Sequence, residues 1–116
     1  MTTYQHSGPR MSQLVVHNGI AYSAGQVADD PSQDIAGQTR QVLGKIDRLL
    51  ADAGSHKSRV LRIEIWLAHI GYFNQMNAVY DAWVDKDNPP VRACVESKLA
   101  VPELLIEIQF TAIAGE

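Results

Sequence analysis

Two stretches of this chain repeat their apolar residues with the spacing of a helix, whereas its other apolar stretches alternate as strands do. The first spans residues 34–53, with Asp34 as its cap and Gly54 in the left-handed position after its end. The second spans residues 72–84 and ends before a proline pair. Its expected buried face is Phe73, Met76, Tyr80, Trp83 and Val84. Because two helices can cover only one face of a sheet, the sequence predicts an α+β domain with one helical layer.

Five stretches predict strands. Asn18 and Gly19 separate the first two, residues 13–17 and 20–24, and this pair favours a two-residue hairpin turn because both positions take positive φ. The other three are residues 60–68, 91–97 and 104–112. The predicted order is β-β-α-β-α-β-β, within a single domain that spans residues 1–116.

Alternation in the last three strands divides their side chains between two faces. One set is apolar and is expected to face the helices: Leu61, Ile63, Ile65, Leu67, Ile106, Ile108 and Phe110. The other set mixes charged and apolar side chains: Arg62, Glu64, Trp66, Arg92, Cys94, Leu105 and Glu107. That mixture is too apolar for open water and too charged for a core. Packing against further copies of the same chain explains it most simply.

Composition excludes several classes of function. A net charge of −3 does not supply the clustered Lys and Arg of a nucleic-acid surface. The single cysteine, Cys94, excludes an internal disulfide and favours a reducing compartment. No apolar run approaches the roughly 20 residues that span a bilayer, and the first residues do not resemble a secretory signal. We therefore expect a cytoplasmic protein that binds neither membrane nor nucleic acid.

Arg92 and Glu107 are the two residues most suited to chemistry, because each interrupts an apolar strand. Arginine presents a planar fork of donors that matches a carboxylate. A glutamate in a partly dry pocket can hold a water molecule and accept its proton. On the residues alone, however, an Arg–Glu ion pair at an interface is the more frequent use of such a pair.

The remaining candidates favour structural roles. Cys94 shares the face of Arg92, but no histidine lies near it in the sequence to activate it. Asn77 lies beside the buried stripe of the second helix, where asparagine caps a backbone group or lines a cavity. The four histidines lack the spacing of metal ligands, so no metal site is expected.

Two segments near the carboxy terminus resemble the signature of the RidA/YjgF/L-PSP family. They read Pro-Val-Arg-Ala-Cys-Val-Glu at residues 90–96 and Leu-Leu-Ile-Glu-Ile at residues 104–108. Similar short matches occur at residues 24–26, 38–39 and 76–80, so the resemblance spans nearly the whole chain. It implies a chorismate-mutase-like fold, a homotrimer with clefts between subunits, and no cofactor.

Active members of that family hydrolyse reactive 2-imino and 2-enamino acids to 2-keto acids and ammonia. The resemblance assigns Arg92 to the substrate carboxylate, Glu107 to the attacking water, and the backbone around Cys94 to contact with the substrate. Gly25 and Asn77 match positions near the cleft. The alternatives are a non-catalytic trimer that binds small carboxylates and an endoribonuclease; the acidic composition speaks against the latter.

The chain departs from the deaminase pattern at two positions. Arg10, which follows Gly8 and Pro9, stands where deaminase members have a tyrosine, and Ala24 stands where they often have a serine. The expected cleft therefore lacks two hydroxyl groups and gains Arg10 in its lining. In these respects the chain resembles a divergent subgroup of the family.

Overall fold

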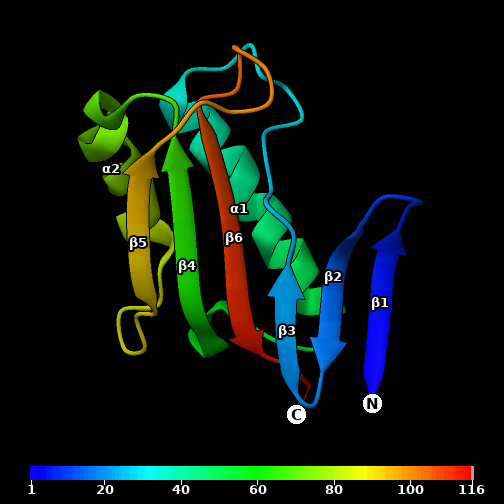
Figure 1. Ribbon diagram of the computed structural model, residues 1–116. Coiled ribbons are helices and arrows are strands. Elements are labelled where there is room, and N and C mark those ends of the chain that lie inside the picture. The colour runs from blue at the N-terminus through cyan, green and yellow to red at the C-terminus, as the bar shows by residue number, and fades with distance from the viewer. Residues whose placement is uncertain (116) are drawn as a thin grey trace.

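The computed structural model describes residues 1–115 and contains one six-stranded sheet with two helices (Figure 1). The elements are β1 (Thr2–Ser7), β2 (Ser12–His17), β3 (Ile20–Ser23), α1 (Ile35–Asp52), β4 (Val60–Leu67), α2 (Phe73–Trp83), β5 (Val91–Glu96) and β6 (Ile106–Ile113). Short 3-10 helices, η1 (Lys57–Arg59) and η2 (Ile70–Tyr72), precede β4 and α2.

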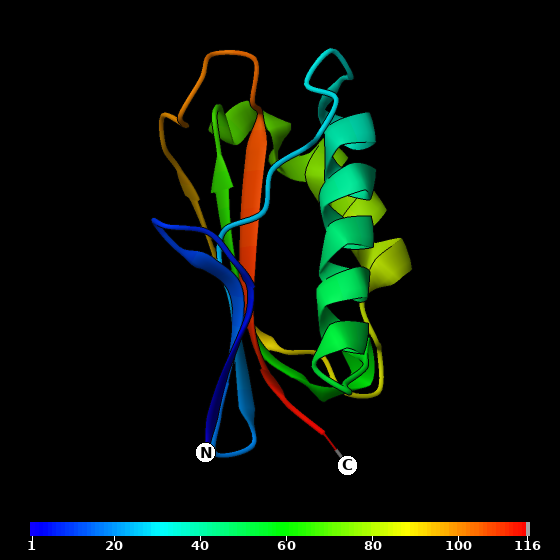
Figure 2. The same cartoon turned by 90° about the vertical axis from the view of Figure 1, so that its right-hand side faces the viewer.

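The strand order is β1-β2-β3-β6-β4-β5, so β1 and β5 are the two edges of the sheet. β4 and β5 are parallel and all other neighbours are antiparallel. Both helices lie on the same face of the sheet, and no helix or strand of residues 1–115 covers the opposite face (Figure 2). The sheet is therefore mixed, and the predicted α+β class with a single helical layer is confirmed.

The caps and the turn that short sequence motifs predicted are present in the structure. Asp34 caps α1, because its carboxylate accepts a hydrogen bond of 2.9 Å from the backbone N–H of Gly37. Gly54 follows the helix at φ +67°. Asn18 and Gly19 take φ values of 50° and 81° between β2 and β3, as a two-residue hairpin turn requires.

β1 is absent from the predicted element order. It pairs along its length with β2, yet all its residues except Gln5 are exposed. An edge strand of this kind is held by backbone hydrogen bonds, so its side chains need not alternate between apolar and polar. The polar composition of residues 2–7 therefore gave no strand signal.

The core lies between the sheet and the two helices. Its fully buried side chains include Leu14, Ile46, Leu50, Ile63, Ile65, Leu67, Met76, Ile106 and Ile108. The expected helix-facing set is confirmed with one exception. A register shift between Val60 and Arg62 turns Val60 into the core and leaves Leu61 43% exposed, so the inward placement of Leu61 was wrong.

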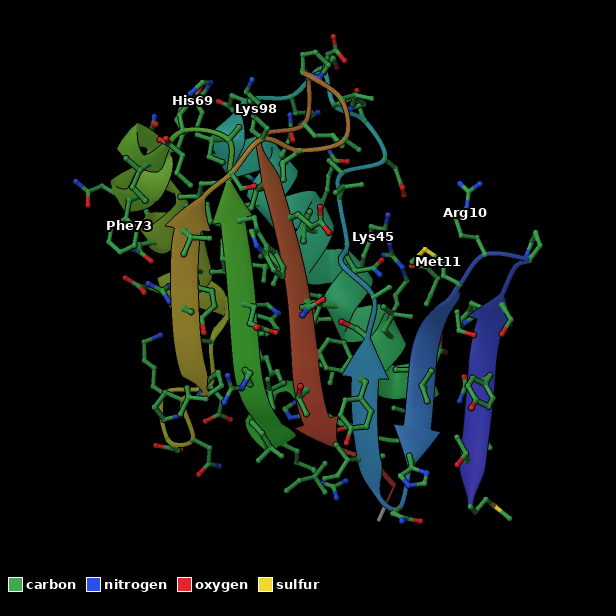
Figure 3. All side chains as sticks on the ribbon, in the orientation of Figure 1. Arg10, Met11, Lys45, His69, Phe73 and Lys98 are labelled. Atoms are coloured by element: carbon green, nitrogen blue, oxygen red, sulfur yellow. The ribbon has the colours of Figure 1, made fainter. Side chains whose placement is uncertain are left out.

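The buried stripe of α2 is shorter than predicted. Met76 and Tyr80 are buried, and Trp83 and Val84 pack partly against the core. Phe73 is 37% exposed, against expectation. It is the first residue of α2, and its side chain lies beside β5 at the free edge of the sheet (Figure 3). No helix within residues 1–115 is long and apolar enough to cross a membrane.

Candidate functional site

Arg92 lies on the helix-covered face of the sheet. It pairs in register with Ile63, and Cys94 pairs with Ile65, both of which are core residues. The prediction that Arg92 and Cys94 point away from the helices was therefore wrong, although the two do share one face. The alternate residues of β5 are apolar but exposed, because they lie on the open face of the sheet at its edge. A prediction based on polarity alone therefore assigned the two faces of this strand the wrong way round.

Three side chains of α2 surround the Arg92 guanidinium. Its Nη1 donates a hydrogen bond of 2.7 Å to the Asn77 side-chain oxygen. Its Cζ lies 4.7 Å from the ring centroid of Tyr80 and 5.7 Å from that of Phe73. These three residues are spaced by four and three positions, so they form one face of the helix. We call Phe73, Asn77 and Tyr80 the α2 cradle.

The Arg92 charge has no acidic partner within residues 1–115, where the ion pairs are His6–Asp52 and Lys45–Asp29. The α2 cradle supplies one acceptor and two aromatic rings, and an arginine carries five donors. Donors therefore remain for an anion. Arg92 is half-buried, and partial burial strengthens the attraction of its charge to a carboxylate.

Glu107 lies on the opposite face of the sheet. It alternates with the buried Ile106 and Ile108, and it pairs in register with Trp66 on the open face. Within residues 1–115 no ion pair involves its carboxylate. This half-buried acid is thus available to a water molecule or a ligand.

Gly25 makes room for the Glu107 carboxylate. Any Cβ at this position would collide with the carboxylate of Glu107. Two backbone hydrogen bonds between Gln26 and Ile108, of 2.7 and 3.0 Å, hold this segment against β6. A side chain at this position would displace the Glu107 carboxylate from its place, so glycine keeps the acid where it lies.

The candidates therefore form two clusters. The clamp cluster consists of Arg92, Cys94 and the α2 cradle, and the acid cluster consists of Glu107 and Gly25. They lie on opposite faces of one sheet, and β4 separates their strands. Neither an Arg92–Glu107 ion pair nor a joint site of both residues forms within one chain.

Arg10 belongs to neither cluster. It lies on the exposed loop between β1 and β2, near the β1 edge of the sheet, whereas Phe73 lies near the β5 edge (Figure 3). The structure thus does not bring Arg10 together with Arg92 within a chain. A hollow of about 740 Å³ between α1 and α2 is also separate, since neither Arg92 nor Glu107 lines it.

The environment of Cys94 is that of a packed thiol. Burial raises the pKa of the Cys94 thiol, and the positive charge of Arg92 partly offsets that rise. The protonated form therefore predominates at neutral pH, which supports a packing role over a nucleophilic one. Within residues 1–115, no three His, Cys, Asp or Glu side chains are grouped as a metal site requires.

The contacts of Tyr80 and Phe73 with Arg92 were not foreseen. Both had been assigned to the buried stripe of their helix. The sequence feature that could have revealed these contacts is the spacing of the two residues from Asn77, which places an amide and two rings on one face of the helix. A third residue with an unforeseen role is Gln38. Its buried side chain forms hydrogen bonds with the backbone of Pro31, Gln33, Glu103 and Leu105 and so joins two loops.

Fold and clusters together define a single-sheet α+β protein with an arginine clamp at one sheet edge and a free acid on its open face. The family described as "Endoribonuclease L-PSP" matches residues 6–114. The chain therefore belongs to the L-PSP family, to which relatives named RutC and YjgF also belong.

Relatives of known sequence cover most of the chain. A RutC family protein of Haemophilus ducreyi is 45% identical over 103 residues, which cover 89% of this chain and 88% of the relative. The RutC family protein YoaB of Escherichia coli is 38% identical over 103 residues, covering 89% of this chain and 90% of YoaB.

Solved structures agree with the fold. A member of the YjgF protein family from Neisseria meningitidis is 41% identical, with a TM-score of 0.97 over 100% of this chain and 97% of that one. A member of the YjgF/YER057c/UK114 family from Mycobacterium tuberculosis is 29% identical, with a TM-score of 0.88 over 98% of this chain and 100% of that one.

Proposed function

We propose that this protein is a hydrolytic deaminase of small 2-imino and 2-enamino acids, and that its site forms where the clamp cluster of one chain meets the acid cluster of the next. The observation that carries this proposal is the placement of Arg92 and Glu107. Within residues 1–115 neither has an ionic partner of opposite charge, and they occupy opposite faces of the sheet. Only a second copy can bring the two groups into one cleft.

The open face supports such an assembly. Several side chains on this face and at its edges are apolar and exposed: Tyr22 at 46%, Leu61 at 43%, Val91 at 61%, Val95 at 48% and Ile113 at 38%. A surface of this kind marks an interface. An edge that packs on a neighbouring face uses different patches on the two partners, and such contacts form a ring when the rotation between partners closes. A ring of three satisfies this geometry and agrees with the trimer that the family resemblance implies.

The proposed chemistry uses two groups. Arg92 binds the substrate carboxylate, which places the imine carbon beside Glu107 of the neighbouring chain. Glu107 accepts a proton from water as the water oxygen attacks that carbon and forms a carbinolamine. The acid then returns this proton to nitrogen. Transfer of the carbinolamine hydroxyl proton to nitrogen accompanies cleavage of the carbon–nitrogen bond, so that the hydroxyl becomes the keto oxygen and ammonia leaves. The 2-imino acid and one water thus give one 2-keto acid and one ammonia.

A turnover assay tests this proposal. 2-Aminoacrylate is generated in situ, and pyruvate formation is followed with wild type, Arg92→Ala and Glu107→Gln. We expect acceleration by wild type and none by Arg92→Ala. An Arg40→Ala variant serves as the control, since Arg40 is an exposed arginine of α1 that lies away from both clusters and from the open face of the sheet. Pyruvate formation at the uncatalysed rate with wild type would overturn the proposal.

A binding protein without turnover is the second candidate. The observation that favours it is that Arg10 and Ala24 stand where deaminase members have a tyrosine and often a serine, so two hydroxyl groups are missing. Arg10 does not replace the tyrosine within one chain, because it lies away from both clusters. In this case a 2-keto acid binds to wild type and to Glu107→Ala but not to Arg92→Ala, because only the arginine supplies the opposite charge. The ribonuclease of the family description finds no support in the net charge of −3.

A further inference from the structure

The α2 cradle holds Arg92 more tightly than an exposed arginine is usually held. The Asn77 oxygen takes one Nη1 donor at 2.7 Å, and two aromatic rings lie within 6 Å of the guanidinium carbon, the nearer at 4.7 Å. A guanidinium stacks on an aromatic ring with its flat face and keeps its edge donors available. Ring contact and hydrogen bonding to an anion are therefore compatible.

The two rings of the cradle differ in burial. Tyr80 is 5% exposed and packs against Trp83, with ring centroids 5.9 Å apart. Burial raises the pKa of the Tyr80 phenol, so the ring stays neutral and is no counter-charge to Arg92. Phe73 is 37% exposed and lies at the free edge of the sheet beside β5 (Figure 3). One ring is thus buried in the core, and the other is partly exposed beside the guanidinium at the edge of the sheet.

We infer that Tyr80 and Asn77 are positioning residues that orient the Arg92 guanidinium for a carboxylate, and that the exposed ring of Phe73 selects acids with an apolar side chain. This inference rests on the proposed function for the identity of the ligand. The cradle restricts the rotamers of Arg92 before the ligand arrives, which lowers the entropy lost on binding. The side chain of a 2-keto acid bound through its carboxylate extends beside Phe73, where an apolar group gains contact and a charged group loses hydration.

Calorimetric binding of 2-oxobutyrate tests the positioning role. The Tyr80→Leu substitution removes the aromatic face and keeps an apolar side chain, whereas Tyr80→Phe keeps the ring and removes the hydroxyl. We expect Tyr80→Leu to raise Kd roughly fivefold to thirtyfold, which is the size of a partly desolvated cation–π contact. Tyr80→Phe should stay within about twofold of wild type. In the turnover assay the same loss should appear in KM with kcat nearly unchanged.

The selective role of Phe73 is read from a ratio of affinities. 4-Methyl-2-oxopentanoate and 2-oxoglutarate are compared on wild type, Phe73→Leu and Phe73→Ala. Wild type and Phe73→Leu should prefer the apolar acid, and Phe73→Ala should lose most of that preference. Because the ratio cancels any common effect on Arg92, it isolates the contact with the ligand side chain.

Three outcomes would overturn the inference. Equal affinity of Tyr80→Leu and wild type would show that the ring does not hold the clamp. Equal loss in Tyr80→Phe and Tyr80→Leu would assign the effect to the hydroxyl. An unchanged preference in Phe73→Ala would remove its selective role. Should Tyr80→Leu fail to fold, Asn77→Ala tests the same positioning from a half-exposed residue, with a severalfold rise in Kd expected.

These failures differ from failure of the proposed function. If wild type binds 2-oxobutyrate without turning over an imine, the deaminase proposal is overturned. The positioning role of the α2 cradle is still tested by the Kd values of its variants. If wild type binds no 2-keto acid, carboxylate binding by Arg92 is overturned, and so is the positioning role of the α2 cradle.

Discussion

The clamp cluster and the acid cluster hold their charges in opposite ways. Arg92 is surrounded by three side chains of α2 on the helix-covered face, whereas Glu107 rests on the open face against the backbone of Gly25. The cation is thus held in place before any ligand arrives, and the acid remains free to bond to one. This division suits a site in which the first group binds and the second reacts.

The largest effect should come from the acid cluster. Glu107→Gln keeps the shape of the side chain and removes its basicity, so we expect kcat to fall by on the order of 100-fold to 10,000-fold. The Kd of 2-oxobutyrate should change by less than about threefold, because Arg92 supplies the charge pairing. Steady-state kinetics measures kcat, and calorimetry measures the Kd of 2-oxobutyrate. A comparable loss in both would show that Glu107 also binds the ligand.

The two faces of the sheet should respond differently to truncation. Ile63→Ala, in the core, should lower the free energy of unfolding by about 2–5 kcal/mol. Leu61→Ala, on the exposed side of the same strand, should instead weaken association of the chains. Chemical denaturation and light scattering over a range of concentrations separate these effects. A concentration-independent loss of stability in Leu61→Ala would argue against an interface there.

The geometry of the clamp should matter beyond its charge. Arg92→Lys keeps the positive charge but loses the planar fork and its stacking on Tyr80. We expect the Kd of 2-oxobutyrate to rise roughly tenfold to a hundredfold, in line with lost hydrogen bonds to a charged group. Calorimetry checks this, with Lys98→Arg on the exposed loop after β5 as the control. Wild-type affinity in Arg92→Lys would mean that charge alone is sufficient.

The smallest effect concerns Cys94. Arg92 partly offsets the rise that burial causes in the pKa of this thiol, so Arg92→Ala should move the pKa further up. The midpoint of the pH profile for alkylation by iodoacetamide should therefore shift to higher pH. The midpoint is the proper readout, because the maximal rate also depends on access. An unchanged midpoint would place Arg92 too far from the thiol to act on it.

Most of the fold was predictable because its signals are local. The cap at Asp34, the turn at Asn18 and Gly19, and the two helical stripes depend on neighbouring residues alone. β1 was missed because an edge strand needs only backbone pairing. Leu61 was misplaced because a single bulge reverses alternation, and alternation cannot reveal a bulge.

The candidate site was predictable in its residues but not in its arrangement. Arg92 and Glu107 stood out because each is a charge within an apolar strand. Their separation onto two faces was hidden, since β5 exposes its valines and covers its arginine with α2. Which face of an edge strand is covered depends on tertiary packing. The role of the α2 cradle was hidden for the same reason.

Complementation between two inactive variants tests the split site most directly. Arg92→Ala and Glu107→Gln chains are co-expressed with different tags, and assemblies that carry both tags are purified. In a ring of three, each mixed assembly holds one cleft with an intact Arg92 and an intact Glu107, so about one third of wild-type turnover should return. An assembly of the double variant with wild-type chains controls for the effect of mixing. Turnover no higher than that of either variant alone would contradict a site shared between chains.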